Sequence, residues 1–277
     1  MSKFILTPEN YYSLEADREY CSASQFKKFV SLGTTACEAK AIAELKGKYA
    51  EPKSDALIFG SIVDYLWEHD GDLTDFNTEH PDIELFSSRG ATKGNILAKW
   101  QKAIDVYNRT KEDELFSQFM SGEKQKIFTG KIEGVDFKCK LDSYLPHKAI
   151  VDLKTTRSIR KPFRITDVGY VSFVEKYSYH HQLALYQELV RQNTGETLPC
   201  FIAAVSKEDV PDIEIIYLDD EVLREALTEV KAKIGNVQML KNGEIEPIRC
   251  EVCEYCRKTK KLTRAIHFSD LLLDYTD

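Results

Sequence analysis

The sequence predicts an α/β protein with a helical N-terminal part, a central sheet and a short cysteine-rich tail. Apolar residues recur at helical spacing in several segments before residue 121, and again in 177–192 and 219–240. Apolar runs of strand length lie between these helices, within 124–155 and 198–218. The order is therefore helices, three strands, a helix, two strands and a helix.

The N-terminal part is expected to be mainly helical. The run Ser22-Ala-Ser24 precedes the first helix and offers a serine as its N-cap, and the run 33–35 then interrupts the pattern. The segment 46–55 and the acidic segment 68–84 are interpreted as loops. We expect helices over 25–29, 36–45 and 59–67, and one long helix or two over 93–120.

The strands are expected in the second half of the chain. We expect strands over 124–131, 134–145, 149–155, 198–206 and 212–218, with the first two paired. The segment 157–176 is interpreted as irregular. A helix over 177–192 should end near Gly195, and the long helix over 219–240 should end at the turn 241–243.

Two acidic residues and a lysine are the most informative feature of these strands. Apolar and polar residues alternate from Val135 onward, which places Asp142 on the polar face of its strand. Asp152 and Lys154 are two residues apart, so on a strand they point to one face. A turn at 146–148 would pair the two strands and gather the three side chains. Two carboxylates can hold a divalent cation, and a lysine beside them can act on a water, which is the equipment for phosphodiester hydrolysis.

Length and composition indicate one domain. The chain has 277 residues, of which 43% are hydrophobic and 30% charged, enough for one substantial core. We expect a single domain over 1–277, with a mainly helical part over 1–121, a core over 122–240 and the cysteine-rich tail over 241–277.

The sequence predicts a cytosolic protein. No apolar run approaches the ~20 residues that span a membrane, and the N-terminal apolar stretch is too short for a signal peptide. The seven cysteines are odd in number, which argues against a disulfide framework and for reduced thiols or metal ligands.

The formal net charge is −7, but its distribution matters more than its sum. The acidic segment 68–84 contains no lysine or arginine, whereas 154–164 and 257–264 contain no acid. A basic run is often only a solvated surface. Because the first basic run directly follows the proposed site, we expect it to contact DNA phosphates. Its residues are Arg157, Arg160, Lys161 and Arg164.

With these residues in view, the chain resembles the PD-(D/E)xK nuclease superfamily. Within its RecB-like branch, the resemblance is closest to phage RecE-like exonucleases of the exonuclease VIII type. Four blocks in the right order carry it, and together they cover most of 20–260. They are 22–37 with Ser-Ala-Ser-Gln-Phe and a later cysteine, 59–64 with Phe-Gly-Ser-Ile-Val-Asp, Leu141-Asp142 with 151–156, and 182–186 with Gln-Leu-Ala-Leu-Tyr. The resemblance implies a restriction-endonuclease-like core with a mixed sheet flanked by helices.

The resemblance also implies roles for the site residues. Asp142 and Asp152 would be metal ligands with the Leu153 carbonyl, and Lys154 would orient or activate the attacking water. Gln182 and Tyr186, four residues apart on one helix face, would line the site. Two departures stand out. Asp64 occupies a position where many RecB-like members have histidine, although its oxygen suits Mg²⁺ or Mn²⁺, and Leu141 stands where the superfamily name has proline.

The cysteine tail predicts a second metal centre. Cys250, Cys253 and Cys256 form a CxxCxxC run whose thiols can face one ion. Some RecB-like nucleases hold a [4Fe–4S] cluster with one early and three late cysteines, and Cys37 falls at the early position. Zinc and free thiols are the alternatives, and the last spacing is shorter than that cluster's usual one. The remaining cysteines, Cys21, Cys139 and Cys200, are expected to be ordinary buried residues, and His180 and His181 to lie on the helix surface or face DNA.

The expected function is a Mg²⁺- or Mn²⁺-dependent exonuclease on duplex DNA ends, in phage-type homologous recombination. A single-strand annealing protein and further copies of the chain are the protein partners that this function implies. A catalytically silent DNA-binding module of the same fold is an alternative, although the intact set of Asp142, Asp152 and Lys154 speaks against it. A structure-specific endonuclease acting on junctions or flaps is another.

Overall fold

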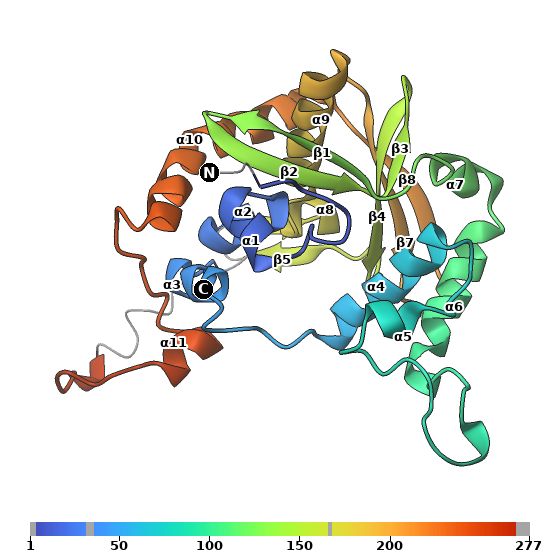
Figure 1. The fold of residues 1–277 in the computed structure, drawn as a ribbon, viewed down its shortest axis with the longest axis horizontal. Helices are drawn as coiled ribbons and strands as arrows, with labels where there is room; N and C mark the ends of the chain where they lie inside the picture. The colour runs from blue at the N-terminus through green and yellow to red at the C-terminus, as the bar shows by residue number, and fades with distance from the viewer. Residues whose placement is uncertain (1–3, 32–35, 166–167, 270–277) are drawn as a thin grey trace.

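The computed structural model describes residues 4–31, 36–165 and 168–269 of the chain (Figure 1). Its first part is helical, as predicted, while the interrupting run 33–35 lies outside the described residues. The segment 93–120 contains two helices. The second begins after Asp113, whose side chain accepts a hydrogen bond from the Phe116 N–H and so caps it. The helices are α1 (Leu14–Glu19), α2 (Ala23–Phe29), α3 (Glu38–Leu45), α4 (Asp55–Glu68), α5 (Phe76–Glu79), the 3₁₀ turn η1 (Gly90–Thr92), α6 (Ala98–Lys111) and α7 (Glu114–Phe119).

The second part carries the strands and, among the described residues, four helices of very different length. The strands are β1 (Lys126–Ile132), β2 (Val135–Leu141), β3 (Ser143–Leu145), β4 (Ala149–Thr156), β5 (Phe163–Ile165), β6 (Gly169–Val171), β7 (Cys200–Ser206) and β8 (Ile213–Leu218). The helices are α8 (Phe173–Lys176), α9 (Tyr179–Thr194), α10 (Asp220–Asn242) and α11 (Glu254–Lys258). Gly195 ends α9 in the left-handed conformation that favours glycine.

The central sheet is mixed, which confirms the predicted fold class. Its strand order is β3-β4-β7-β8, with β4 and β7 parallel and the outer pairs antiparallel. The β1–β2 hairpin forms a separate two-stranded sheet, and β5 pairs with β6 in a third. Among the described residues, every helix is too short or too polar for a membrane span.

The strand expected over 134–145 is two strands, so that prediction is wrong in one respect. β2 pairs with β1, whereas β3 pairs with β4, and Asp142 stands at the change of partner. The alternation of apolar residues continues from β2 into β3 because the pattern depends on which face of a strand is buried. It does not depend on which strand lies next to it. The interpretation of 157–176 as irregular is also wrong. It contains β5, β6 and α8, and Ser172 and Glu175 form a capping box that starts α8.

Apolar residues fill both faces of the central sheet. On β4, Val151 and Leu153 pack with α4, α6 and α7, while Ile150 packs with α9, α10 and the β1–β2 hairpin. Figure 1 shows α4–α7 on one side of the sheet and α2, α9 and α10 on the other. Because side chains alternate along a strand, Asp152 and Lys154 share the face of Ile150 and point toward α9.

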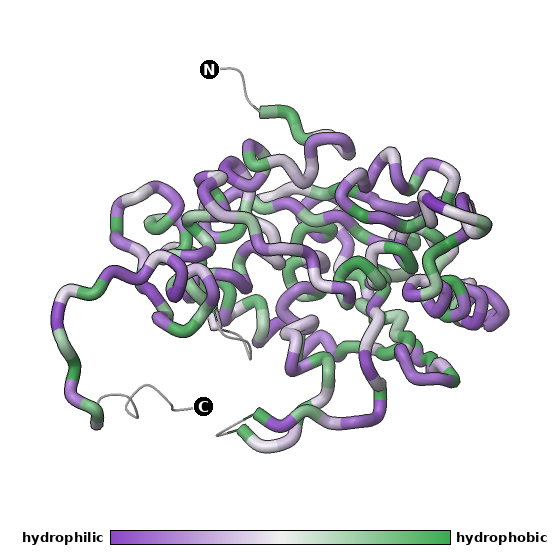
Figure 2. The backbone as a smooth tube through the Cα atoms, turned by 90° about the horizontal axis from the view of Figure 1, so that it is seen from below, coloured by the Kyte–Doolittle hydropathy of each residue, from purple (hydrophilic) through white to green (hydrophobic). Residues whose placement is uncertain are grey.

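The last described residues lead away from the rest of the molecule. After α11, residues 259–269 form what we call the C-terminal arm, which stands away from the helices and sheets in two perpendicular views (Figures 1 and 2). Figure 2 shows hydrophilic and hydrophobic residues alternating along it.

Candidate active site

The change of strand partner at Asp142 brings the first carboxylate to β4. The 145–148 turn joins β3 to β4, with the Lys148 N–H donating to the Leu145 carbonyl at 3.0 Å. Asp142 Oδ2 then accepts a hydrogen bond from the Leu153 N–H at 2.7 Å. The side chain of Asp142 therefore lies beside the segment that carries Asp152 and Lys154.

Asp152 is the most buried acid of the group, with 1% of its surface exposed. Its Oδ1 accepts a hydrogen bond from Gln182 Nε2 at 2.9 Å, and the same nitrogen lies 2.8 Å from the Tyr186 hydroxyl. Its Oδ2 forms an ion pair with the Lys154 ammonium. The structure thus brings together Asp142, Asp152, Lys154, Gln182 and Tyr186, which come from three separate segments of the sequence.

Asp64 approaches the same point from α4. Ser54 caps this helix, and the apolar side chains of Ile62 and Val63 hold it against the sheet. Gln125 Nε2 lies 3.5 Å from Asp64 Oδ2. A cavity of about 520 Å³ opens beside Asp64, and Glu68, Lys140 and Gln125 also line it.

The pKa values of Asp142 and Asp64 are both raised in this site. Burial is the largest cause for Asp142, whose pKa lies well above its ordinary value, and the charges of Asp64 and Asp152 add to it. Burial likewise raises the pKa of Asp64 to about 6, against attraction from Lys140. Burial opposes the charge of Lys154, but Asp152 and Asp142 outweigh it and raise the pKa of the ammonium. The site therefore holds more negative charge than its lysine balances.

These donors fit a hard divalent cation. Despite the ion pair with Lys154, Asp152 Oδ2 is buried and accepts no hydrogen bond of normal geometry from the described residues. A buried anionic oxygen without a hydrogen-bond donor lowers the stability of the folded protein unless a cation binds it. Carboxylate oxygens are the ligands that Mg²⁺ and Mn²⁺ prefer. Within the described part of the chain, the oxygens of the three acids are not gathered within 4.8 Å of one another, whereas the thiols of Cys37, Cys250, Cys253 and Cys256 are.

A second lysine near the site was not anticipated from the sequence. Lys27 of α2 donates to the Tyr177 carbonyl at 2.8 Å, and its Nζ lies 5.1 Å from the centre of the Tyr179 ring. Lys154 Nζ lies 5.0 Å from the same ring. Burial, and then the charge of Lys154, lower the pKa of Lys27 to about 7. No pattern marks Lys27 in the sequence, whereas Glu68 follows Asp64 by one helical turn and was open to inference.

Part of the basic run after β4 is already paired with acidic side chains. Arg160 forms ion pairs with Asp212 and Glu214, and Lys161 lies 3.5 Å from Glu208. These acids come from the segment between β7 and β8 and from β8 itself, so no inspection of 154–164 could find them. Arg157 lies over the Phe163 ring, and neither Arg157 nor Arg164 forms an ion pair with the described residues.

The expected surface position of the two histidines is wrong for His181. Its side chain is 5% exposed and its Nε2 lies 2.8 Å from Glu229 Oε2, because this face of α9 packs on α10. His180 is partly exposed, and burial lowers its pKa to about 4. Neither residue joins the carboxylate group.

The four cysteines of the predicted second centre lie together. The Sγ atoms of Cys37, Cys250, Cys253 and Cys256 are all within 4.8 Å of one another. Cys37 precedes α3 and Cys253 precedes α11, so the group joins the N-terminal part to the tail. Burial raises the pKa of the Cys250 thiol, but hydrogen bonds from the backbone N–H groups of Cys253 and Val252 lower it. The result is a pKa of about 7. The other cysteines are buried elsewhere, at Cys21, Cys139 and Cys200.

The spacing of these sulfurs fits a single ion. Tetrahedral zinc with Zn–S bonds of about 2.3 Å separates its sulfurs by about 3.8 Å. Cys37 and Cys256 are 3.5 Å apart and Cys250 and Cys256 are 3.9 Å apart. A [4Fe–4S] cluster places iron and sulfide between the thiolates, so the four side chains would have to spread to hold it.

Comparison with known proteins places this geometry in a family. Residues 22–259 match the model of the PDDEXK-like domain of unknown function, DUF3799, and the chain belongs to this family. A crystal structure from Eubacterium rectale, described as a candidate exonuclease, is 42% identical with a TM-score of 0.90, and the match covers 97% of this chain and 98% of that one. The structure of SSO0001 is 13% identical with a TM-score of 0.29, covering 79% and 91%, and carries no argument. A search of curated proteins gave no match.

Proposed function

We propose that the protein is a metal-dependent deoxyribonuclease that hydrolyses phosphodiester bonds at duplex DNA ends. The observation that carries this proposal is the convergence of Asp142, Asp152 and Lys154 around one buried point, with Gln182 bonded to Asp152. Membership of the PDDEXK-like family and similarity to a candidate exonuclease support it.

Asp64, Asp142, Asp152 and the Leu153 carbonyl would hold Mg²⁺ or Mn²⁺. When bound, such an ion lowers the pKa of a coordinated water and offsets charge on the phosphate. The protein's own contribution is to fix the donors. Asp142 is held by the Leu153 N–H, and Asp152 by Gln182, so neither carboxylate rotates freely.

Lys154 would serve as a hydrogen-bond donor at the reacting phosphate. Its ammonium already lies against Asp152 and 3.3 Å from the Leu153 carbonyl, so its position is fixed before substrate binds. From there it orients the attacking water and stabilises negative charge that develops on the phosphate. Gln182 and Tyr186 are positioning residues, because they reach the site through Asp152.

Action on DNA ends is favoured over the two alternatives. Similarity to a candidate exonuclease supports end-directed cleavage, and the resemblance to RecE-like enzymes extends this to phage-type recombination with a single-strand annealing partner. A structure-specific endonuclease would use the same residues. A silent DNA-binding module has no requirement for a buried lysine paired with a buried aspartate, since such a pair is costly to desolvate.

One experiment separates these functions. The full chain is incubated with linear and with covalently closed duplex DNA, in Mg²⁺ and then in excess EDTA. We expect linear DNA to be degraded only with Mg²⁺, closed circles to survive, and Asp152→Asn to be inactive. Asp105→Asn, an exposed change on α6, is the matched control and should keep activity. Nicking of circles would favour an endonuclease, and no cleavage of either DNA would favour the silent module.

The cysteine group is proposed to hold one structural zinc ion, in place of the iron–sulfur cluster expected from the resemblance. The short sulfur–sulfur distances support a single ion. Such an ion would fasten Cys37 at the start of α3 to the three cysteines of the tail. Hydrolysis needs no electron transfer, so this centre would stabilise the fold and take no part in the chemistry.

A further inference from the structure

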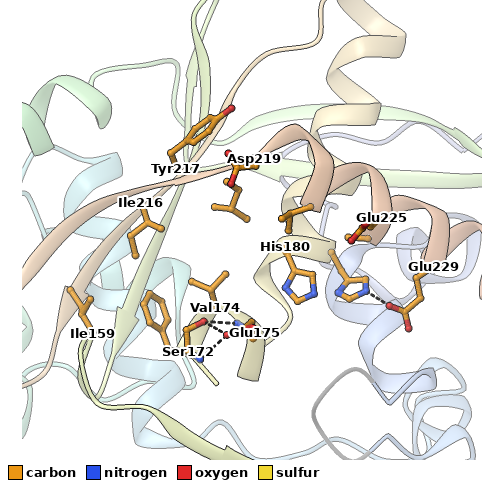
Figure 3. Close-up of a pocket in the computed structure, with 15 residues that line it drawn as sticks. Ile159, Ser172, Val174, Glu175, His180, Ile216, Tyr217, Asp219, Glu225 and Glu229 are labelled. Atoms are coloured by element: carbon orange, nitrogen blue, oxygen red, sulfur yellow. Dashed lines mark hydrogen bonds and ion pairs between the residues drawn. The ribbon is translucent and has the colours of Figure 1, made fainter. Parts of the chain in front are cut away.

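A groove lies apart from the carboxylate group, between α8, α9, the end of β8 and the start of α10 (Figure 3). Its volume is about 550 Å³. Ile159, Phe173 and Ile216 form an apolar floor, and Asp219, Val222 and Glu225 stand at the rim. We call this feature the acidic groove.

The charge of the acidic groove is negative. Asp219 and Glu225 are exposed, and neither forms an ion pair with the described residues. Glu175 and Glu229 also line the groove, although the first bonds Ser172 and the second His181 (Figure 3). No lysine or arginine lines it. This surface repels DNA and suits a partner that is both cationic and apolar.

The C-terminal arm has the complementary chemistry. Its residues 259–269 contain Lys260, Lys261 and Arg264 and no acid, the next acid in the sequence being Asp270, and only Lys260 reaches an acidic partner among the described residues, at 3.9 Å. Its apolar side chains are open to solvent, with Leu262 85% and Phe268 76% exposed. Large apolar side chains that are exposed in series commonly mark an interaction site.

We propose that the acidic groove binds the C-terminal arm of a second copy of this chain. Leu262 and Phe268 would bury apolar surface on the groove floor, while Lys261 and Arg264 would meet Asp219 and Glu225 at the rim. The C-terminal arm points away from the rest of its own chain in both views (Figures 1 and 2). The cysteine group holds α11, from which the arm starts, against the N-terminal part. Binding to the groove of a neighbouring molecule is therefore favoured over binding to the groove of the same chain. Arm and groove are different surfaces, so the contact joins copies head to tail or by reciprocal exchange.

The test measures molecular mass in solution without DNA. We expect the full chain to be oligomeric by sedimentation or light scattering. Leu262→Asp with Phe268→Asp on the arm, or Val222→Arg with Glu225→Lys on the rim, should weaken self-association at least about tenfold. All four positions are exposed, so folding should be retained, which circular dichroism checks. Leu115→Asp, at an exposed site on α7, is the control and should leave the mass unchanged.

Mixing the two variants gives the sharpest result. The arm variant keeps an intact groove and the rim variant keeps an intact arm, so an equimolar mixture should form one to one dimers that neither forms alone. A monomeric wild type, or an oligomer that both variants leave unchanged, would overturn the proposal. If the arm variant has the same oligomeric mass as the wild type but binds DNA more weakly, the arm is a DNA-binding segment and the proposal is wrong. These readings do not depend on nuclease activity.

Discussion

Asp64 gives a prediction whose size follows from the structure. Burial raises the pKa of its carboxyl from 3.8 to about 6. A raised folded-state pKa means that the group lowers stability when it is ionised. The free energy of unfolding is therefore unaffected below pH 3.8 and falls as pH rises to about 6, above which the loss is complete. At ~1.4 kcal/mol per pKa unit, the gap corresponds to ~3 kcal/mol at pH 7.

Asp64→Asn removes the ionisable group and keeps its size. In EDTA at pH 7 we expect the variant to be more stable than the wild type by up to ~3 kcal/mol, with the difference vanishing near pH 3.5. The loss of the 3.5 Å contact with Gln125 should be small by comparison. Urea unfolding at a series of pH values measures the difference. Asp105→Asn, at an exposed position on α6, is the control and should change stability by less than about 0.5 kcal/mol.

Magnesium should reduce the stability difference between the two proteins. A ligand that binds only the folded state stabilises it in proportion to its affinity, so Mg²⁺ should raise the stability of the wild type more than that of Asp64→Asn. The reasoning is refuted if the variant is less stable than the wild type in EDTA at pH 7, or if the difference does not depend on pH. Equal stabilisation of both by Mg²⁺ would remove Asp64 from the proposed ligands.

Three further outcomes are expected. Lys154→Ala should retain Mg²⁺ binding by calorimetry but lose about 10²-fold or more of the cleavage rate, because a charged donor at the phosphate is missing; cleavage at the wild-type rate would contradict its role. Arg157→Ala with Arg164→Ala should flatten the slope of log affinity against log salt by about one to two, whereas Arg160→Ala should change it less because that side chain is already paired. Cys253→Ser should release one zinc ion per chain by elemental analysis and lower the melting temperature; brown protein that contains iron would show a cluster instead, and neither metal with four reactive thiols would leave only free cysteines.

The helices and the central strands were predictable because local signals mark them. A serine of the run 22–24 is the expected cap of α2, and Ser22 caps it through the Gln25 N–H; Gly195 ends α9, as the sequence indicates. The approach of Asp142 to β4 also follows from the sequence, since a short turn at 146–148 leaves few other arrangements. The four-residue spacing of Gln182 and Tyr186 was enough to place both on one face of α9.

Features that depend on distant segments were not predictable. The acids that neutralise Arg160 lie more than fifty residues away, at Asp212 and Glu214. The approach of Lys27 to Tyr179 depends on how α2 packs against the start of α9, and no periodicity encodes that contact. His181 is expected at the helix surface or facing DNA, but α10 covers that face of α9.

The aspartate at position 64 links the stability of the protein to its proposed chemistry. A neutral histidine there would leave two buried carboxylates beside Lys154, whereas Asp64 adds a third negative charge to a site with little solvent. That charge repels the other carboxylates, which lowers the stability of the cation-free protein. The same charge attracts a divalent ion and so increases its affinity. Asp64→His should therefore resemble Asp64→Asn in EDTA at pH 7, since a neutral ring also removes the repulsion. It should still differ from Asn in Mn²⁺, because imidazole is a good ligand for transition metals and an amide is a weak one.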